Sequence, residues 1–337
     1  MFSWQGRRVA ITGATGFVGL HAAKDLRTHG ADVVALVRAT SDIRYLSEAE
    51  ISCRVASLDD TNMLAEVLRG CDVVVHSAGA VGFEPHWDEF IRVNVDGTRN
   101  LFKAARLAGV RRVVHTSSIV AVGGTKKPIV LDEAVSWNLK SCRVPYVTTK
   151  RWAEEAAMAE NGNGLEVVVV NPGSVIGPND FAGSEFGTLI QRFWSGWIPF
   201  HFGGGNNYVD VRDVAQGIRL AAEIGRPGER YLLVGENRSF QQFYADLCRT
   251  AARRIPFVRL PSALAPIIGL LDDRLRRRGT RRPFLSSVQA KLMGLFFYFD
   301  GSKARRELGF NPRPLNQTLA DSYEFWTAGS SMHSVSA

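Results

Sequence analysis

The chain has 337 residues, of which 45% are hydrophobic and 22% charged, and its formal net charge is +8. These proportions are ordinary for a globular protein and exclude disordered and fibrous classes; the length suits an α/β unit with a smaller second lobe. No apolar run approaches the roughly 18 residues that span a bilayer, and the first residues lack a secretion-signal core. We therefore expect a cytoplasmic protein.

The positive charge is concentrated in one run, where six arginines lie between Arg274 and Arg282. A nucleic-acid surface usually spreads basic residues, interleaved with aromatic ones, over a whole face, so we predict no nucleic-acid partner. The four cysteines, at positions 53, 71, 142 and 248, have neither CxxC nor metal-ligand spacing. We expect reduced thiols and no metal site.

The first half of the chain alternates short β-branched runs with amphipathic segments, the pattern of a parallel sheet covered by helices on both faces. We expect strands at 8–12, 32–37, 52–56, 72–76, 113–116 and 166–171, and helices over 17–29, 89–108 and 146–160. The predicted fold class is α/β, a Rossmann-type doubly wound parallel sheet with a smaller, discontinuous C-terminal substrate lobe.

The pattern becomes irregular after Asn171 and recovers between Val209 and Val234. This predicts an interrupted domain organisation. The first domain, with the main sheet, takes residues 1–171 and 208–235, the second lobe takes 172–207 and 236–327, and the small, polar tail 328–337 is flexible.

A glycine-rich turn follows the first predicted strand and opens the first predicted helix. Gly13 permits the tight turn, Gly16 lets a pyrophosphate approach the backbone, and Gly19 allows the helix to pack closely on the sheet. Together with the glycines, this turn contributes Thr15, Phe17 and Val18 to the predicted cofactor site. We therefore predict a bound dinucleotide.

The GxxGxxG spacing of this turn resembles the fingerprint of the extended short-chain dehydrogenase/reductases, the NAD-dependent epimerase/dehydratase superfamily. Four later segments are similar to the same family: HSAG at 76–79, NVDGT at 94–98, NPGSVIGP at 171–178 and YVDVRDVA at 208–215. The resemblance extends over residues 6–327. It implies further cofactor contacts from Ser77, Ala78, Gly79, Asn94, Thr116, Pro172, Gly173 and Val175. For Asn94 the resemblance also implies a part in a water relay, and a second interpretation stays open, in which its side chain only ties two strands together.

Arg38 closes the second predicted strand, where an acidic residue would bind the ribose hydroxyls of NAD. A guanidinium suits a 2′-phosphate, so we predict NADP, with NAD or a merely solvated arginine as the alternative. The sequence departs from the family at two places: Ser57, followed by Leu58, stands where the family often has Asp, and Asn171 where it often has Arg. Ser57 and Leu58 are still assigned to the cofactor site.

Tyr146 and Lys150 are four residues apart, so a helix places both on one face. In this order along the chain, they and Ser118 resemble the catalytic set of the family. The resemblance implies that Tyr146 exchanges the proton, Ser118 holds the substrate oxygen and Lys150 binds the ribose. Positive charge from Lys150 and the oxidised nicotinamide is expected to stabilise the phenolate. Ser117 is the competitor of Ser118.

Aromatic residues crowd the loops expected to face the nicotinamide, which is typical of a pocket for apolar ligands. The predicted substrate-binding residues are Phe83, Trp87, Phe181, Phe186 and Trp194. Residues 37–42 and 300–304 make the chain similar to dihydroflavonol-reductase-like and 3β-hydroxysteroid-dehydrogenase-like members. We therefore predict interconversion of a secondary alcohol and a ketone on a bulky sterol, isoprenoid or flavonoid.

Two other functions stay open at this point. The first is a nucleotide-sugar epimerase or dehydratase with tightly bound NAD, in which Arg192 and Arg212 grip a diphosphate. The second is a non-catalytic nucleotide sensor, which the intact Ser-Tyr-Lys set disfavours.

The surface of the molecule has two predicted contacts. The family usually dimerises through two helices of each subunit, here 89–108 and 146–160, which implies a homodimer. Separately, 261–271 is mostly apolar and precedes the arginine run, while 292–299 is a further apolar stretch. These segments either rest on an anionic membrane surface or pack over the second lobe beside solvated arginines.

Overall fold

The computed structural model describes residues 2–83, 86–195, 200–254, 257–276 and 285–333. Its main feature is a seven-stranded, all-parallel sheet with the strand order β11-β7-β5-β4-β1-β2-β3. The strands are β1 (Arg8–Thr12), β2 (Asp32–Val37), β3 (Ser52–Val55), β4 (Val73–His76), β5 (Arg112–Thr116), β7 (Glu166–Pro172) and β11 (Arg230–Leu233). About half of their residues are valine, isoleucine or leucine, and all of these except Val55 at the edge strand β3 are buried, as a sheet covered by helices requires.

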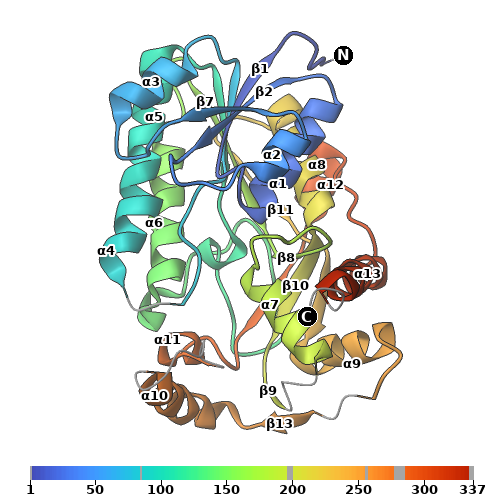
Figure 1. Cartoon of the computed structure of the whole chain (residues 1–337). Coiled ribbons are helices and arrows are strands. Elements are labelled where there is room, and N and C mark those ends of the chain that lie inside the picture. Colours follow the sequence, from blue (N-terminus) through green and yellow to red (C-terminus); the bar gives the residue numbers. More distant parts are fainter. Residues whose placement is uncertain (1, 84–85, 196–199, 255–256, 277–284, 334–337) are drawn as a thin grey trace.

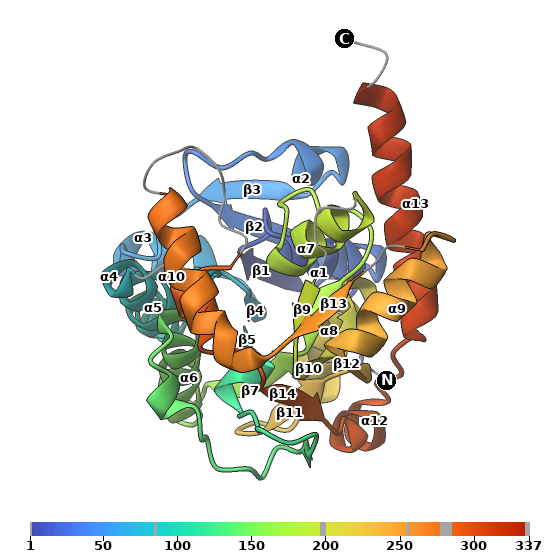
Figure 2. The same cartoon turned by 90° about the horizontal axis from the view of Figure 1, so that it is seen from below.

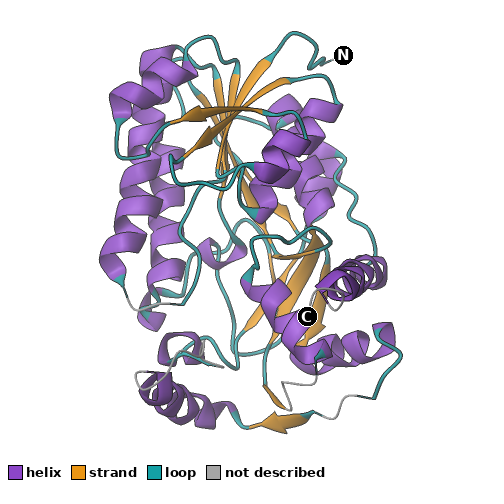
Figure 3. Cartoon of the chain, viewed as in Figure 1, coloured by secondary structure: helices purple, strands orange, loops and turns teal. Residues whose placement is uncertain are grey.

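Helices cover both faces of this sheet, as Figures 1 and 3 show. One face packs against α1 (Phe17–Thr28), α8 (Val211–Ile224) and α12 (Ser302–Leu308). The other face packs against α3 (Thr61–Leu68), α5 (Gly97–Ala108) and α6 (Pro145–Ala159). The predicted Rossmann-type fold is confirmed, and each expected strand forms within two residues of its predicted ends.

One predicted helix, over 89–108, is built in three pieces. It begins as α4 (Trp87–Phe90), continues as a π-helical turn (Ile91–Asp96) and ends as α5. π-helical turns inside α-helices are often found at functional sites because they re-aim one side chain. Asn94 lies in this turn.

A smaller sheet with its helices forms what we call the second lobe, below the main sheet in Figure 1. Its strand order is β12-β10-β14-β6, with β8 also paired to β10, and a separate pair joins β9 and β13. The strands are β6 (Val130–Leu131), β8 (Ser174–Ile176), β9 (Phe200–Phe202), β10 (Gly205–Asp210), β12 (Glu236–Ser239), β13 (Val258–Leu260) and β14 (Phe296–Phe299). The accompanying helices are α7 (Glu185–Trp194), α9 (Phe240–Thr250), α10 (Ala265–Arg276), α11 (Ser287–Ala290) and α13 (Leu315–His333).

The chain passes between the two sheets more than once. β10 belongs to the smaller sheet, whereas the following α8 and β11 return to the main one, and α12 buries Ala304 and Leu308 in the core beneath α8. The predicted division at 171/172, 207/208 and 235/236 stays a prediction. α13 continues to His333, so it overlaps the tail predicted from 328, whose last four residues lie outside the described ranges.

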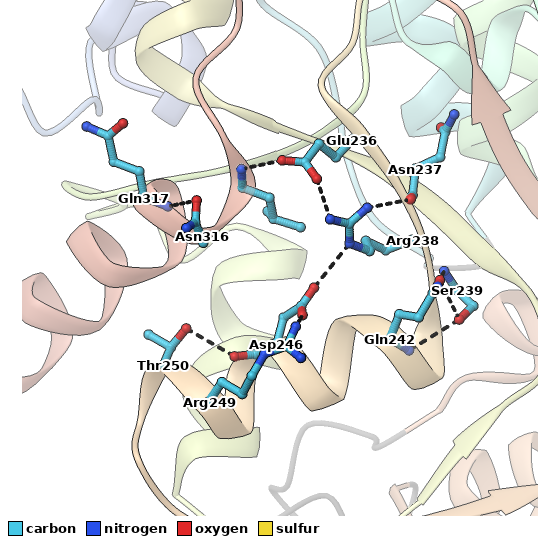
Figure 4. A network of polar contacts seen from close by, with 11 residues as sticks. Glu236, Asn237, Arg238, Ser239, Gln242, Asp246, Arg249, Thr250, Asn316 and Gln317 are labelled. Atoms are coloured by element: carbon cyan, nitrogen blue, oxygen red, sulfur yellow. Dashed lines mark hydrogen bonds and ion pairs between the residues drawn. The ribbon is translucent and has the colours of Figure 1, made fainter.

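Polar contacts hold the outer strand of the second lobe to two helices (Figure 4). Glu236 on β12 accepts a hydrogen bond from Leu315 N at 2.8 Å and pairs with Arg238, which also lies 3.3 Å from Asp246 on α9. Ser239 and Gln242 form a capping box at the start of α9. The lobe is therefore fixed at β12 by charges as well as by its aromatic core.

Candidate active site

The glycine-rich turn forms a cradle that excludes side chains. Gly13 has a φ of +71°, and a Cβ at this residue would lie 2.6 Å from Ala78 N; a Cβ on Gly19 would overlap Gly13 O. α1 begins after Gly16 with neither a side-chain cap nor an acidic residue in its first turn. Its first N–H groups are thus suited to an anionic ligand, and the cradle fits the pyrophosphate of a dinucleotide.

The neighbouring strand ends are locked together by buried polar side chains. His76 Nδ1 lies 2.7 Å from Thr12 Oγ1, and its Nε2 lies 3.0 Å from Thr98 Oγ1. Ser77 Oγ lies 2.8 Å from Thr116 Oγ1. These contacts connect the carboxyl ends of β1, β4 and β5, where parallel sheets bind ligands. They bring Ser77 and Thr116, two predicted cofactor residues, together.

Asn94 satisfies its whole side-chain amide inside the protein. Its Oδ1 accepts from Ala80 N at 2.7 Å, and its Nδ2 donates to Ala80 O at 3.1 Å and to Thr149 Oγ1 at 3.0 Å. The geometry is that of a tie between the loop after β4 and α6. A water-relay role for Asn94 stays a prediction.

Tyr146 and Lys150 lie on the first two turns of α6, which starts with a proline at its first position. Tyr146 is half-buried; exclusion of water raises the pKa of the phenol, the Ser118 hydroxyl lowers it, and the charge of Glu185 raises it further. Burial is the largest of these causes. The expected stabilisation of the phenolate by Lys150 and the oxidised nicotinamide stays a prediction.

Lys150 is buried and donates from Nζ to Thr116 O at 2.8 Å. Burial lowers the pKa of Lys150 to about 8, and the negative charge of Glu154 opposes this shift. The ammonium therefore stays within reach of the strand end where the ribose of a dinucleotide is expected. Its side chain also approaches Gly79, since a Cβ there would lie 4.0 Å from Nζ.

A buried polar network beneath the catalytic set was not predicted from the sequence. Asn171 Nδ2 donates to Ser118 O at 3.0 Å and to Glu154 Oε2 at 2.6 Å. Glu154 is fully buried and pairs with Arg230 on β11 at 2.8 Å. The family often has an arginine where this chain has Asn171. In this chain an arginine of the neighbouring strand, Arg230, reaches the same network. The sequence contained an indication of this network, because Glu154 follows Lys150 by four residues and therefore lies on the same buried face of α6.

Ser117 and Ser118 differ in their partners. Ser118 accepts from Val120 N at 3.4 Å at the start of a short helical turn, and its hydroxyl lowers the pKa of Tyr146. Ser117 Oγ is buried, and in the part of the chain that is described it has no hydrogen-bond partner. The arrangement favours Ser118 over Ser117 as the side chain that holds a substrate oxygen.

The remaining loop residues of the predicted cofactor site lie beside the sheet. Pro172 ends β7, and a Cβ on Gly173 would lie 2.7 Å from Asn207 Oδ1, so the loop passes close to β10. Val175 is the middle residue of β8, paired with Val209. These three residues follow β7, the strand next to β5 and its Ser117-Ser118 end.

Arg38 is exposed directly after β2, and its N–H donates to Ser41 Oγ at 3.1 Å. Ser57 is exposed after β3, where its Oγ accepts from Asp59 N at 3.2 Å. Leu58 packs beside α5, because a Cβ on Gly97 would lie 3.1 Å from it. The three residues sit at the ends of adjacent strands β2 and β3, on the edge where the adenosine half is expected.

The predicted substrate residues do not all gather at Tyr146. Phe83 lies edge-on to the Tyr146 ring at 6.5 Å, and Phe90, which was not predicted, lies at the same distance. Trp87 instead packs against Trp152 on the outer side of α6, at 6.3 Å. Phe83 is therefore the predicted aromatic with the clearest structural support.

The other three aromatics belong to the second lobe. Phe181 stacks on Tyr45 at 3.8 Å, and Phe186 contacts Tyr208 at 5.8 Å. Trp194 is only 7% exposed, lies in the core of the lobe and donates from its indole to Leu247 O at 3.0 Å. A role of these residues in substrate binding stays a prediction. Trp197, a further aromatic residue of this region in the sequence, lies outside the described ranges.

Two further observations concern metal ligands and membrane-spanning helices. Among the described residues, no three His, Cys, Asp or Glu side chains are grouped so that they could hold a metal ion. In the same residues, no helix has both the length and the apolar character needed to cross a membrane.

The fold and the glycine cradle define a Rossmann-type dinucleotide-binding protein with a Ser-Tyr-Lys constellation at its strand ends. Residues 9–233 match the model of the NAD dependent epimerase/dehydratase family. The chain belongs to this family, as the sequence resemblance implied, and is an NAD-dependent oxidoreductase of the extended short-chain type.

Comparisons with individual proteins give three informative similarities. The chain is 33% identical over 321 residues to a Synechocystis protein described as dihydroflavonol 4-reductase-like, covering 94% of this chain and 93% of that one. It is 34% identical to sterol demethylase protein B of Methylococcus capsulatus, covering 92% and 95%. A solved nucleoside-diphosphate-sugar epimerase of Pseudomonas aeruginosa is 29% identical, with a TM-score of 0.80 and coverage of 96% and 98%.

Proposed function

We propose that this oxidoreductase interconverts a secondary alcohol and a ketone, using Ser118, Tyr146 and Lys150. The observation that carries the proposal is the buried Lys150, whose Nζ donates to Thr116 O at 2.8 Å at the strand end that leads into Ser118, one helical turn beyond Tyr146 on α6. These three side chains meet at the carboxyl ends of β5 and β7, beside the glycine cradle. Such an arrangement serves proton transfer to or from an oxygen next to a bound dinucleotide.

The chemistry of the set follows from its proton balance. When bound, the nicotinamide supplies or accepts the hydride. Because burial raises the pKa of Tyr146, its phenol is protonated and can donate to a carbonyl oxygen that accepts a second hydrogen bond from Ser118. In the reverse direction, the phenolate form of Tyr146 takes the proton of the alcohol. Lys150, held at Thr116 O, binds the ribose and supplies positive charge near the phenol.

NADP is the proposed cofactor within this NAD-dependent family. The guanidinium of Arg38 is exposed after β2, where it can pair with a 2′-phosphate. No acidic residue stands at that strand end to bind both ribose hydroxyls, since Ala39 and Thr40 follow Arg38. NAD is the alternative.

A bulky, largely apolar ring compound is the proposed substrate class. Phe83 and Phe90 flank Tyr146, and two relatives of about one-third identity are named for sterol and dihydroflavonol chemistry. The nucleotide-sugar alternative draws support from the Pseudomonas structure. Against it, Arg212, which would have to grip a diphosphate, is paired with Asp210 and Asp321, each at 2.6 Å.

The test is a substrate panel followed by cofactor absorbance and product analysis. We expect turnover of sterol, isoprenoid or flavonoid ketones with NADPH, and none of UDP- or dTDP-sugars. If the sugars react while every apolar ketone is inert, the epimerase or dehydratase function replaces this proposal.

We also propose a homodimer through α5 and α6. Trp152 on α6 and Leu107 on α5 are large apolar side chains exposed on this side of the sheet, and Trp87 packs beside Trp152. Light scattering at micromolar concentration should give twice the monomer mass, and Trp152→Glu should give the monomer. A monomeric wild-type protein would contradict the dimer.

A further inference from the structure

Helix α10 exposes an apolar stripe. Ile267, Leu270, Leu271 and Leu275 are each 56–68% exposed. Their spacing of three and four residues places them on one face of the helix, since each residue advances the helix by about 100°. In an ordinary surface helix such a stripe would face the core. Here it faces outward.

The acidic residues of α10 point the opposite way. Asp272 Oδ2 accepts from Leu285 N at 2.7 Å, and Asp273 Oδ2 accepts from Ser287 N at 3.1 Å. Both carboxylates thus hold the chain that leads into α11. The contacts also fix the rotation of α10 about its axis, so the leucines cannot turn inward without breaking them.

Close packing fixes the same orientation from a second side. Gly269 faces α11 so closely that a Cβ would lie 2.9 Å from Ser287 Cα. Ala265, fully buried, and Ile268 pack into the small core with Phe202 and Leu285. The inner face of α10 is therefore complete, and the apolar stripe is in excess of what the fold uses.

Positive charge accompanies the stripe. Arg274 is exposed on the same face as Leu270 and Leu271, because it follows them by four and three residues. The sequence then continues with five more arginines, at positions 276, 277, 278, 281 and 282, whose side chains lie outside the described part of the structure. The outer face of α10 thus combines four aliphatic side chains with one described cation, Arg274, while its two carboxylates are turned inward.

We propose that α10 docks on an anionic membrane surface, with its aliphatic stripe among the acyl chains and the long side chain of Arg274 extending to the headgroups. An amphipathic helix binds bilayers in this way, and arginine can keep its charged end at the headgroups while its stem lies along apolar surface. A second copy of this chain fits poorly, because two such faces would bring Arg274 and its counterpart together without carboxylates to pair them. The position is also open: α10 lies at the end of the molecule away from the main sheet and is in front when seen from below (Figure 2).

The docked helix would lie close to the catalytic set. Ser286, which caps α11, donates from Oγ to Phe83 O at 3.2 Å, and the Phe83 ring contacts Tyr146. Docking would thus bring a membrane-borne apolar ketone to the side of the molecule where Phe83 lies. This delivery rests on the proposed function, whereas the docking itself does not.

Vesicle flotation tests the docking. The full chain is mixed with phosphatidylcholine vesicles with or without phosphatidylglycerol. We expect flotation only with the anionic lipid, weakening at high salt. Leu270→Ser combined with Leu271→Ser should lower the bound fraction about tenfold or more, and Arg274→Gln about fivefold, the usual contribution of one cation near an anionic surface.

The matched control is Ile224→Ser, which changes an aliphatic side chain of similar exposure, 52%, at the end of α8. It should float like the wild type, and turnover of a detergent-solubilised ketone should be equal in all four proteins. Absence of flotation, or flotation unchanged in the leucine variant, overturns the docking. A leucine-dependent dimer without flotation would assign the stripe to a second copy instead. Loss of turnover in every protein, with flotation intact, would contradict only the proposed function.

Discussion

The two parts of the molecule use their side chains in opposite ways. At the carboxyl ends of the main sheet, polar groups are buried and bonded to one another, from Thr12 and His76 to Lys150 at Thr116 O. In the second lobe the core is aromatic, with Tyr208 stacked on Phe243 at 3.9 Å. The residues proposed for catalysis therefore lie where the strand ends converge, whereas the aromatic side chains of the second lobe fill its core.

The difference implies different responses to substitution. A polar group at the strand ends should affect turnover more than stability, since its contacts orient reacting atoms. An aromatic side chain of the lobe should affect stability more than turnover, because it fills the core. The predictions below examine each side of this contrast.

The largest effect is expected at Tyr146. Tyr146→Phe keeps the ring contacts with Phe83 and Phe90 but removes the proton donor, so turnover should fall by about 10²–10⁴-fold while cofactor affinity is nearly unchanged. Steady-state kinetics and calorimetric titration of the cofactor measure the two quantities. Activity within about tenfold of the wild type would remove Tyr146 from the mechanism.

The two adjacent serines provide a matched control for that experiment. Ser118→Ala removes the hydroxyl that is proposed to hold the substrate oxygen beside Tyr146, so it should also lower turnover strongly. Ser117→Ala removes a hydroxyl that is buried without a partner among the described residues, so turnover should hardly change. Equal losses in the two variants would contradict the assignment of Ser118.

The next effect is on stability. Trp194→Ala removes a buried indole and its hydrogen bond to Leu247 O, which should lower the free energy of unfolding by about 3–5 kcal/mol. Turnover of the folded fraction should remain close to that of the wild type. Urea denaturation and kinetics at low temperature measure both. A stable variant with altered substrate preference would instead support the sequence-based prediction that Trp194 binds substrate.

The same contrast explains what the sequence could predict. The glycine cradle, the helical spacing of Tyr146 and Lys150, and the strands of the main sheet depend on local rules, and all lie where they were expected. The positions of Trp87, Phe181 and Trp194 depend on which surfaces meet in three dimensions. An aromatic residue in a loop looks the same in sequence whether it lines a pocket or fills a core.

The Glu154–Arg230 pair shows a further limit. The two residues are far apart in the chain and meet because β11 lies next to β7 in the main sheet. Spacing along α6 could have indicated that Glu154 is buried, but its partner comes from tertiary pairing alone. The exposed face of α10 shows the same limit. An apolar run in the sequence does not reveal which of its residues face solvent until the residues packed beside it, here Leu285 and Ser287, are known.

A smaller effect is expected at the cofactor end. Arg38→Ala should weaken NADP binding by roughly 1.5–3 kcal/mol, the contribution of a charged hydrogen bond, and leave NAD binding nearly unchanged. Titration calorimetry with both cofactors measures the difference. Equal affinities of the wild type for the two cofactors, unchanged in the variant, would contradict the NADP preference.

The last prediction concerns three histidines: His76 and His115, buried at the ends of β4 and β5, and the partly buried His21 on α1. Burial lowers the pKa of His76 to about 3 and, at the other face of the sheet, that of His21 to about 4; burial also lowers the pKa of His115. The unfolded chain, with histidine near its usual pKa of about 6.5, therefore binds more protons than the folded one at mildly acidic pH. Their contribution is complete above about pH 6.5 and is lost as the pH falls toward the folded values. Between pH 6.5 and 5.5, each of these histidines should lower the free energy of unfolding by about 1 kcal/mol.

His115 allows a clean test, since both of its ring nitrogens are buried without a partner among the described residues. His115→Leu should thus lose about 1 kcal/mol less than the wild type over that interval in urea titrations. An equal loss in both proteins would show that His115 is not part of the acid sensitivity.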